Sequence, residues 1–107
     1  MRSRRVRFTP ESAAQAEAID RWWRRHRPAS PDLFAHELRD AIKLLARAPG
    51  AGRVYQTLAL AGVRRVLLHG VRSHVYFVVR ESFVVIVAVW SARRGEGPPL
   101  GSFPFTH

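Results

Sequence analysis

Cysteine is absent from the 107-residue sequence, and acidic residues are few. Without cysteine the chain forms neither a disulfide nor a thiolate metal site. Eight acidic residues stand against 18 basic ones, so the formal net charge is +10. Such an excess usually favours polyanions or acidic proteins as partners. All but one of the basic residues are arginine, which fits phosphate recognition and equally fits the codon bias of a GC-rich genome.

Long apolar runs are also missing. The most apolar run, Phe83 to Trp90, is far shorter than the roughly 20 residues of a membrane helix, and no apolar segment follows the basic start MRSRRVRF. We therefore expect a soluble, cytoplasmic protein with no membrane association. The length predicts a single domain over residues 1–107. Residues 95–107, which hold three prolines and three glycines, are expected to form an irregular tail.

Two segments have the apolar spacing of amphipathic helices. The first follows a half-buried strand, Arg4 to Thr9, and starts with the cap, proline and acid of Thr9-Pro10-Glu11. The same order in Ser30-Pro31-Asp32 predicts the start of a second helix, which ends at Ala48-Pro49-Gly50. The link is short, so we expect an antiparallel helical hairpin. The core stripe of the first helix is predicted to contain Ser12, Ala16, Ile19 and Trp23, with Trp22 at its edge.

Beyond Gly52 the pattern changes to strands. Val54 to Leu60 is either a weak strand or an extended loop, whereas the later segments are rich in valine and aromatic residues. Short links between the later segments predict an antiparallel meander; its strands are Val63 to His69, His74 to Arg80 and Phe83 to Trp90. The fold class is therefore α+β, in the order β-α-α-β-β-β(-β), with a helical hairpin packed on one face of a small, mainly antiparallel sheet.

The positive charge is concentrated outside the helices. Residues 1–9 carry +4 and residues 50–107 carry +5, but residues 10–49 carry only +1. Since an unpaired buried guanidinium is strongly disfavoured, the arginines should lie on the open sheet face and at the strand ends. Strand alternation places His74, Tyr76, Val78 and Arg80 on that face. Phe83 to Trp90 is apolar on both faces, so the open face needs a cover. A protein partner is the simplest cover, although another helix or the tail could serve.

Several residues have both a functional and a structural interpretation. Arg64, Arg65 and Arg72 could bind phosphate or simply keep strand edges soluble. For Arg93 and Arg94 we favour target contact, because a buried strand delivers them to a rigid rim beside glycines. Trp22 and Trp23 are expected to pack in the core. No histidine or carboxylate pair has ligand spacing backed by a third group, so we expect no metal and no cofactor.

The order and spacing of several segments resemble the RelE/ParE superfamily of toxins from bacterial type II toxin–antitoxin systems. The resemblance covers about Val6 to Leu100 and is carried by VRFTPESAAQAEAI, the WW pair, FAHELRDAIKLLARAPGAGR, GVRRVLL, HVYFVV and VVIVAVWSARRGEGPP. It implies a β-α-α-β-β-β toxin that inhibits growth and is neutralised by a cognate antitoxin in a hetero-oligomer. It also implies a role in plasmid stabilisation, and a basic surface that acts on the target.

The superfamily has two branches with different targets, so whether the chain is an enzyme stays open. RelE-like members cleave mRNA on the ribosome, and ParE-like members poison DNA gyrase. If the chain is RelE-like, the resemblance implies Arg93 as a catalytic residue, with Arg65 or His69. The tyrosine that RelE-like members carry near the C-terminus is missing after Trp90, where His107 is the remaining candidate, so we favour the ParE-like branch. Our candidate target-binding residues are Arg64, Arg65, Arg72, His74, Tyr76, Arg93 and Arg94.

Overall fold

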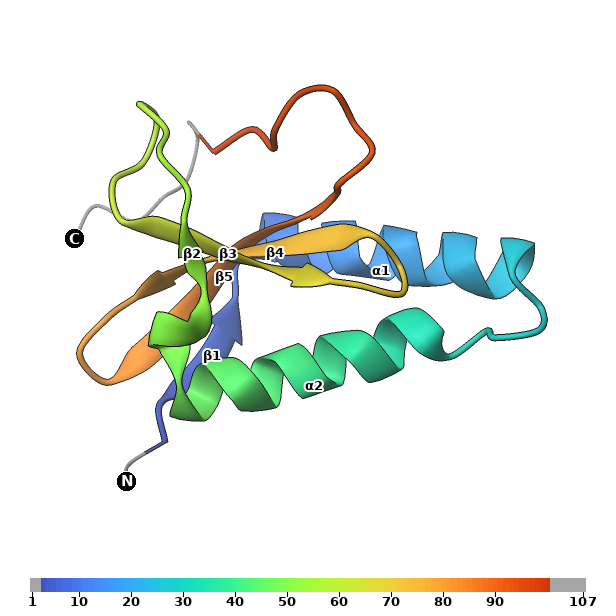
Figure 1. The fold of residues 1–107 in the computed structure, drawn as a ribbon, viewed down its shortest axis with the longest axis horizontal. Helices are drawn as coiled ribbons and strands as arrows, with labels where there is room; N and C mark the ends of the chain where they lie inside the picture. Colours follow the sequence, from blue (N-terminus) through green and yellow to red (C-terminus); the bar gives the residue numbers. More distant parts are fainter. Residues whose placement is uncertain (1–2, 101–107) are drawn as a thin grey trace.

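The structure, a computed structural model, describes residues 3–100 (Figure 1). Its elements confirm the predicted α+β class and the predicted order. A single turn of 3-10 helix, Pro49–Ala51, lies between the helical and the strand-rich parts. The helices and strands are β1 (Arg5–Phe8), α1 (Pro10–His26), α2 (Leu33–Arg47), β2 (Arg53–Val54), β3 (Val63–Leu68), β4 (Ser73–Val79) and β5 (Phe83–Ser91).

The strands form one mixed sheet in the order β1-β5-β4-β3-β2. As predicted, β3, β4 and β5 make an antiparallel meander. The first strand, β1, pairs in parallel with β5, which is possible because both helices and the meander separate the two strands in sequence. Strand β5 is therefore an interior strand with a neighbour on each edge. Its sequence is apolar on both faces because its residues are buried in a cluster on each side of the sheet.

The start of α1 follows the predicted signal. The Oγ1 of Thr9 accepts a hydrogen bond from the Ser12 backbone N at 3.0 Å, and Pro10 occupies the first helical position. The Ser12 hydroxyl is buried and donates to the Ile86 carbonyl at 2.7 Å. The cap and this bond together fix the first turn of α1 to the middle of β5.

The predicted start of the second helix at Ser30 is wrong. Helix α2 begins at Leu33 with Asp32 at its N-cap, and no side chain makes a capping hydrogen bond there. The Ser30 carbonyl instead accepts a bond from the Leu33 backbone N at 3.2 Å. Ser30 and Pro31 thus form a separate turn, and the helix cap lies two residues later than predicted, at Asp32.

Both helices pack on the same face of the sheet and run antiparallel to each other (Figure 1). The core between helices and sheet is centred on Phe34 and Leu45 of α2 and on Phe77 and Ile86 of the sheet. Trp23 lies partly buried against this core, as expected. Trp22 does not: its side chain is 46% exposed. Within residues 3–100, no helix is long and apolar enough to span a lipid bilayer.

The opposite face of the sheet is covered by the chain itself. Its buried residues, among them Val63, Val78 and Val85, form a second cluster that includes Leu100. Of the segment Val54 to Leu60, Val54 alone is in a strand, and the rest is a loop that contributes Tyr55 and Leu60 to the cover. The tail up to Leu100 lies over the same face and has no helix or strand. The chain's own tail and loop, and not the protein partner favoured from the sequence, therefore cover this face in the structure. The remainder of the predicted tail, residues 101–107, lies outside the described residues.

Candidate target-binding surface

A cluster of one arginine and three aromatic rings occupies the tail-covered face of the sheet. Arg65 of β3 pairs with Tyr76 of β4 across the ladder, and its Nη1 donates to the Tyr76 hydroxyl at 3.2 Å. The guanidinium carbon also lies 5.0 Å from the ring centroid of Tyr55, while the two tyrosine rings meet edge to face at 4.9 Å. The positively charged guanidinium group of Arg65 is therefore held by the tyrosine rings and by the Tyr76 hydroxyl. We call Arg65, Tyr55, Tyr76 and His74 the Arg65 cluster.

Two members of the Arg65 cluster differ from the prediction that they form an open, charged surface. Tyr76 is 2% exposed, so it holds Arg65 in place and offers almost no surface of its own. His74 lies with its ring centroid 5.9 Å from that of Tyr76. Burial, and secondly the charge of Arg65, lower the pKa of His74 below its usual value of 6.5. His74 is therefore neutral at neutral pH, and the positive charge of the cluster belongs to Arg65.

The two arginines after β5 lie on an exposed loop that is tied back to the sheet. The backbone N of Arg93 donates to the Ser91 Oγ at 3.2 Å, and the Ala92 N donates to the Arg72 carbonyl at 2.8 Å. The Arg94 guanidinium carbon lies 4.3 Å from the ring centroid of Trp90. We call Arg93, Arg94 and the exposed Arg72 of the β3–β4 turn the arginine rim. The predicted delivery of Arg93 and Arg94 to an exposed edge is what the structure shows.

A bulge in β5 turns Trp90 toward Arg94. Tyr76 pairs with Ala88, but its neighbour Phe77 pairs with Ile86, which leaves Val87 as an extra residue in β5. Before the bulge the even-numbered residues of β5 face the helices. After it Trp90 lies on the face of the Arg65 cluster, opposite His74. Without the bulge the indole would point to the helices, and Arg94 would lack its ring.

The remaining predicted residues lie elsewhere. Arg64 precedes Arg65 in β3 and therefore lies on the opposite face of the strand. There its Nη1 donates to the Gly52 carbonyl at 2.8 Å. His69 is exposed in the β3–β4 turn and lines a shallow hollow with Glu37 and Asp40 of α2. The three residues proposed for a ribonuclease, Arg65, His69 and Arg93, thus occupy three separate places. Among residues 3–100 no hydrogen bond or ion pair joins any two of them, and His107 lies outside this range.

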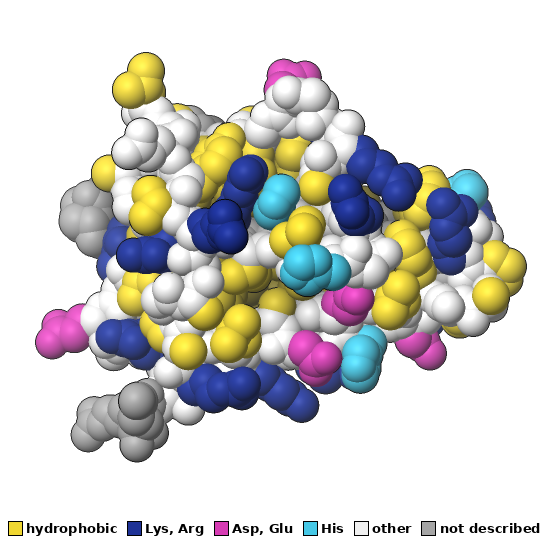
Figure 2. Space-filling view, in the orientation of Figure 1, with side chains coloured by type: hydrophobic (Ala, Val, Ile, Leu, Met, Phe, Trp, Pro, Cys, Tyr) yellow, Lys and Arg dark blue, Asp and Glu magenta, His cyan; other side chains and the backbone are white. Residues whose placement is uncertain are grey.

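The ion pairs among the described residues involve the helices and the turn between them, and not the candidate surface. Arg24 pairs with Asp20 at 3.0 Å and with Asp32 at 2.8 Å, and His36 lies 3.4 Å from Asp40. Figure 2 shows one face of the molecule, where dark blue basic side chains alternate with yellow hydrophobic and cyan histidine side chains. In the described part of the chain, no carboxylate pairs with the Arg65 cluster or with the arginine rim. No group of three or more side chains suited to a metal ion was found between residues 3 and 100.

Sequence reasoning missed two aromatic residues of this surface. Tyr55 lies in a loop, so no alternation pattern assigned it to a face. Trp90 was placed only at the end of a strand, because the bulge that orients it leaves no local signal in a run of valines. Both rings matter because each lies against the guanidinium group of an arginine.

Comparison with known proteins agrees with this fold. The sequence model of a family described as "ParE toxin of type II toxin-antitoxin system, parDE" matches residues 6–95. A solved structure described as "Chromosomal ParDE TA system from P. aeruginosa" has a TM-score of 0.69 and 17% sequence identity. That similarity covers 85% of this chain and 98% of the other. No curated protein matches the sequence.

A small basic α+β domain of this topology, matched over this range, is a toxin of a type II toxin–antitoxin system. Within that class, the chain belongs to the ParE toxin family, because the family match spans most of its length.

Proposed function

We propose that this chain inhibits DNA gyrase and is neutralised by a cognate antitoxin. The family membership supports a toxin, and one feature of the geometry favours this mode of action. Arg65 and Arg94 lie against aromatic rings, and no carboxylate among the described residues pairs with them or with Arg93. Guanidinium groups held in this way are available to a macromolecular target that carries negative charge.

Binding accounts for the site better than RNA cleavage does. A metal-free ribonuclease needs a base, an acid and a cation within reach of one phosphate. Arg65 lies on the sheet face, His69 lies beside α2, and Arg93 lies on the loop after β5. A toxin that binds the complex of gyrase and DNA through an arginine surface does not need a base, an acid and a cation at one point.

Neutralisation requires an antitoxin segment that competes for the same arginines. We expect that segment to combine two kinds of side chain. Acidic side chains should form ion pairs with the arginine rim, and apolar ones should cover the exposed parts of Trp90 and Trp22. Co-expression with the cognate antitoxin should therefore raise the soluble yield of the toxin and abolish growth arrest. A yield and an arrest that no antitoxin changes would contradict this part of the proposal.

A pair of assays tests the target. Purified gyrase acting on relaxed plasmid should lose supercoiling activity at stoichiometric toxin, and cleaved DNA complexes should accumulate. Primer extension on translated mRNA, run with the same toxin preparation, should show no toxin-dependent cuts. Unimpaired supercoiling together with cuts inside codons would reject gyrase as the target and establish the endoribonuclease alternative.

A further inference from the structure

A pocket of about 480 Å³ opens at one end of the sheet, where three separate segments meet. The last turns of α1 supply Trp22 and Trp23, the residue that caps its C-terminus is Arg27, and the loop after β5 supplies Arg93 and Arg94. The β3–β4 turn and the paired strand ends close the remaining sides, with Ser73 opposite Ser91 in the ladder. We call this the Arg–Trp pocket. Its volume lies within the range typical of small-ligand sites, about 300 to 1,000 Å³.

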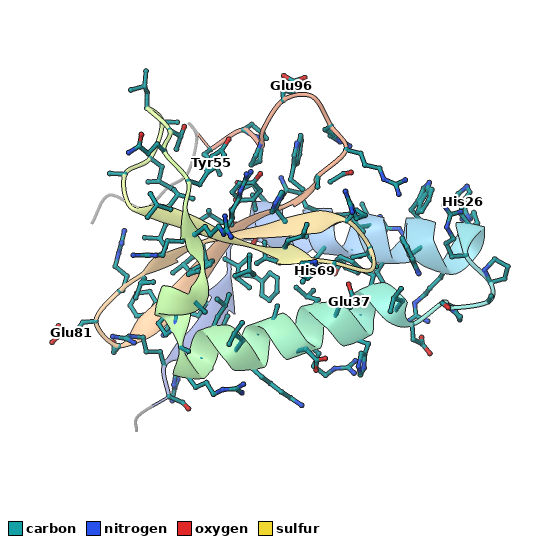
Figure 3. The ribbon with its side chains drawn as sticks, in the orientation of Figure 1. His26, Glu37, Tyr55, His69, Glu81 and Glu96 are labelled. Atoms are coloured by element: carbon teal, nitrogen blue, oxygen red, sulfur yellow. The ribbon has the colours of Figure 1, made fainter. Side chains whose placement is uncertain are left out.

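The aromatic wall of the pocket is held in place before any ligand arrives. The Trp23 Nε1 donates to the Ser30 carbonyl at 2.7 Å. The Arg27 guanidinium carbon lies 5.2 Å from the ring centroid of Trp22 and 5.7 Å from that of Trp23. The ring of His26, at the end of α1 in Figure 3, stacks on Trp22 at 4.6 Å. Trp22 nonetheless remains 46% exposed, so the part of its ring that His26 does not cover faces the solvent beside Arg27.

The charge in the pocket is positive and unneutralised. Three of its lining residues are arginines, and none is acidic. Glu37, which is not part of the lining, points from α2 to the β3–β4 turn (Figure 3) and accepts hydrogen bonds from the backbone N of Gly70 and Val71. Glu96 lies at the outer bend of the loop after β5 in Figure 3. Within residues 3–100 no carboxylate pairs with Arg27, Arg93 or Arg94.

We propose that the Arg–Trp pocket binds one nucleotide of single-stranded DNA, with the phosphate between Arg27 and Arg93 and the base against Trp22. Guanidinium groups match phosphate oxygens in geometry and charge. Indole rings bind unpaired bases of any sequence through their faces. A base inside a duplex does not offer its face to a side chain, so the combination of rings and arginines selects single strands. The inference rests on the proposed function, to which it adds a direct contact with the DNA that gyrase holds.

Binding of a short fluorescein-labelled oligothymidylate, followed by fluorescence anisotropy without gyrase, tests the proposal. The full chain should bind it, and Arg27→Gln and Trp22→Ala should each weaken binding by about fivefold or more. Removing one phosphate-binding arginine should also reduce the slope of log affinity against log salt by about 0.7. The matched control is Arg47→Gln, which removes the same charge from the exposed last turn of α2, and it should change affinity by less than about twofold.

Each contrary outcome overturns the proposal. Equal losses in Arg27→Gln and Arg47→Gln would mean that only the overall positive field attracts DNA. If the chain bound a duplex of the same length as tightly as the single strand, base binding by the tryptophans would be contradicted. Displacement by inorganic phosphate or polyglutamate at matched charge concentration would indicate a simple anion site or an acidic peptide site. Circular dichroism of Arg27→Gln and of Trp22→Ala should match that of the unsubstituted chain, because the side chains of Arg27 and Trp22 are exposed.

The same measurements separate this inference from the proposed function. Oligonucleotide binding that depends on Arg27, in a chain that leaves gyrase unaffected, would overturn gyrase inhibition and support the pocket. Gyrase inhibition by a chain that does not bind the oligonucleotide would overturn the pocket and support gyrase inhibition.

Discussion

Glu37 is expected to fix the β3–β4 turn, which carries one side of the Arg–Trp pocket. Its carboxylate accepts bonds from the Gly70 backbone N to both oxygens at 3.1 Å and from the Val71 N at 3.3 Å. The approach is so close that a Cβ at position 70 would overlap the Glu37 carboxylate and displace it from its present position. Two residues further on, Arg72 adopts a left-handed conformation with φ of 55°, which only a well-anchored turn maintains.

The size of the effect follows from these bonds. A hydrogen bond to a charged group contributes about 1.5 to 3 kcal/mol, but water can replace part of it at a site as exposed as Gly70. We expect Glu37→Ala to lower the free energy of unfolding by about 1 to 2 kcal/mol. For a domain of this size each kcal/mol shifts the melting temperature by about 4 to 8 °C. Glu37→Gln keeps one acceptor oxygen and should lose about half as much.

Thermal unfolding and amide hydrogen exchange measure both consequences. The control is Asp40→Ala, which removes an exposed carboxylate from the same helix, where its contact in the described structure is His36. Glu37→Ala should melt several degrees lower than the control, and the amides of Gly70 and Val71 should exchange faster than in the unsubstituted chain. Equal melting temperatures for the two variants, with protection at Gly70 retained, would refute the role assigned to Glu37.

Three further substitutions test the fold and the electrostatics. Because burial and Arg65 lower the pKa of His74, its contribution to stability is fully present above about pH 6.5 and is lost as the pH falls toward the folded-state pKa; thermal unfolding of His74→Gln should show less loss on acidification, and an unchanged pH profile would refute this. Ser12→Ala removes the bond to Ile86 and should cost about 1 to 3 kcal/mol in urea unfolding, so a cost near zero would contradict the assigned anchor. Leu100→Ala should cost about 2 kcal/mol in the same assay if the tail covers the sheet, and an unchanged midpoint would show that it does not.

The elements that could be predicted from the sequence are those with local signals. Thr9 and Pro10 fixed the start of α1, because a cap and a proline act within one turn. Valine-rich segments with short links predicted the meander. The pairing of β1 with β5 was not predicted, because parallel neighbours lie far apart in sequence and share no local signal. The predicted cap of the second helix at Ser30 was wrong, because Ser30 bonds to Leu33 through its backbone carbonyl and not through its side chain. Every residue has that carbonyl, so this bond leaves no signal in the sequence.

The candidate surface was predicted in part. Strand alternation correctly placed His74 and Tyr76 on one face, but it could not show that Arg65 pairs with Tyr76 there or that Tyr55 folds over both of them from a loop. Nor could it show that a bulge at Val87 would turn Trp90 to the face of the Arg65 cluster. The Arg–Trp pocket was not predicted, because the spacing of Trp22 and Trp23 along the first helix is that of core residues. Trp22, near the C-terminal end of α1, is nevertheless 46% exposed.

The most direct test of the account compares gyrase inhibition by two doubly substituted chains of equal charge. Arg93→Gln with Arg94→Gln removes two arginines of the rim, and Arg39→Gln with Arg47→Gln removes two exposed arginines from α2. The concentration for half-inhibition of supercoiling should rise by about tenfold or more in the first pair and stay close to that of the unsubstituted chain in the second. Equal inhibition by both pairs would contradict the claim that the arginine rim is the surface that meets the target.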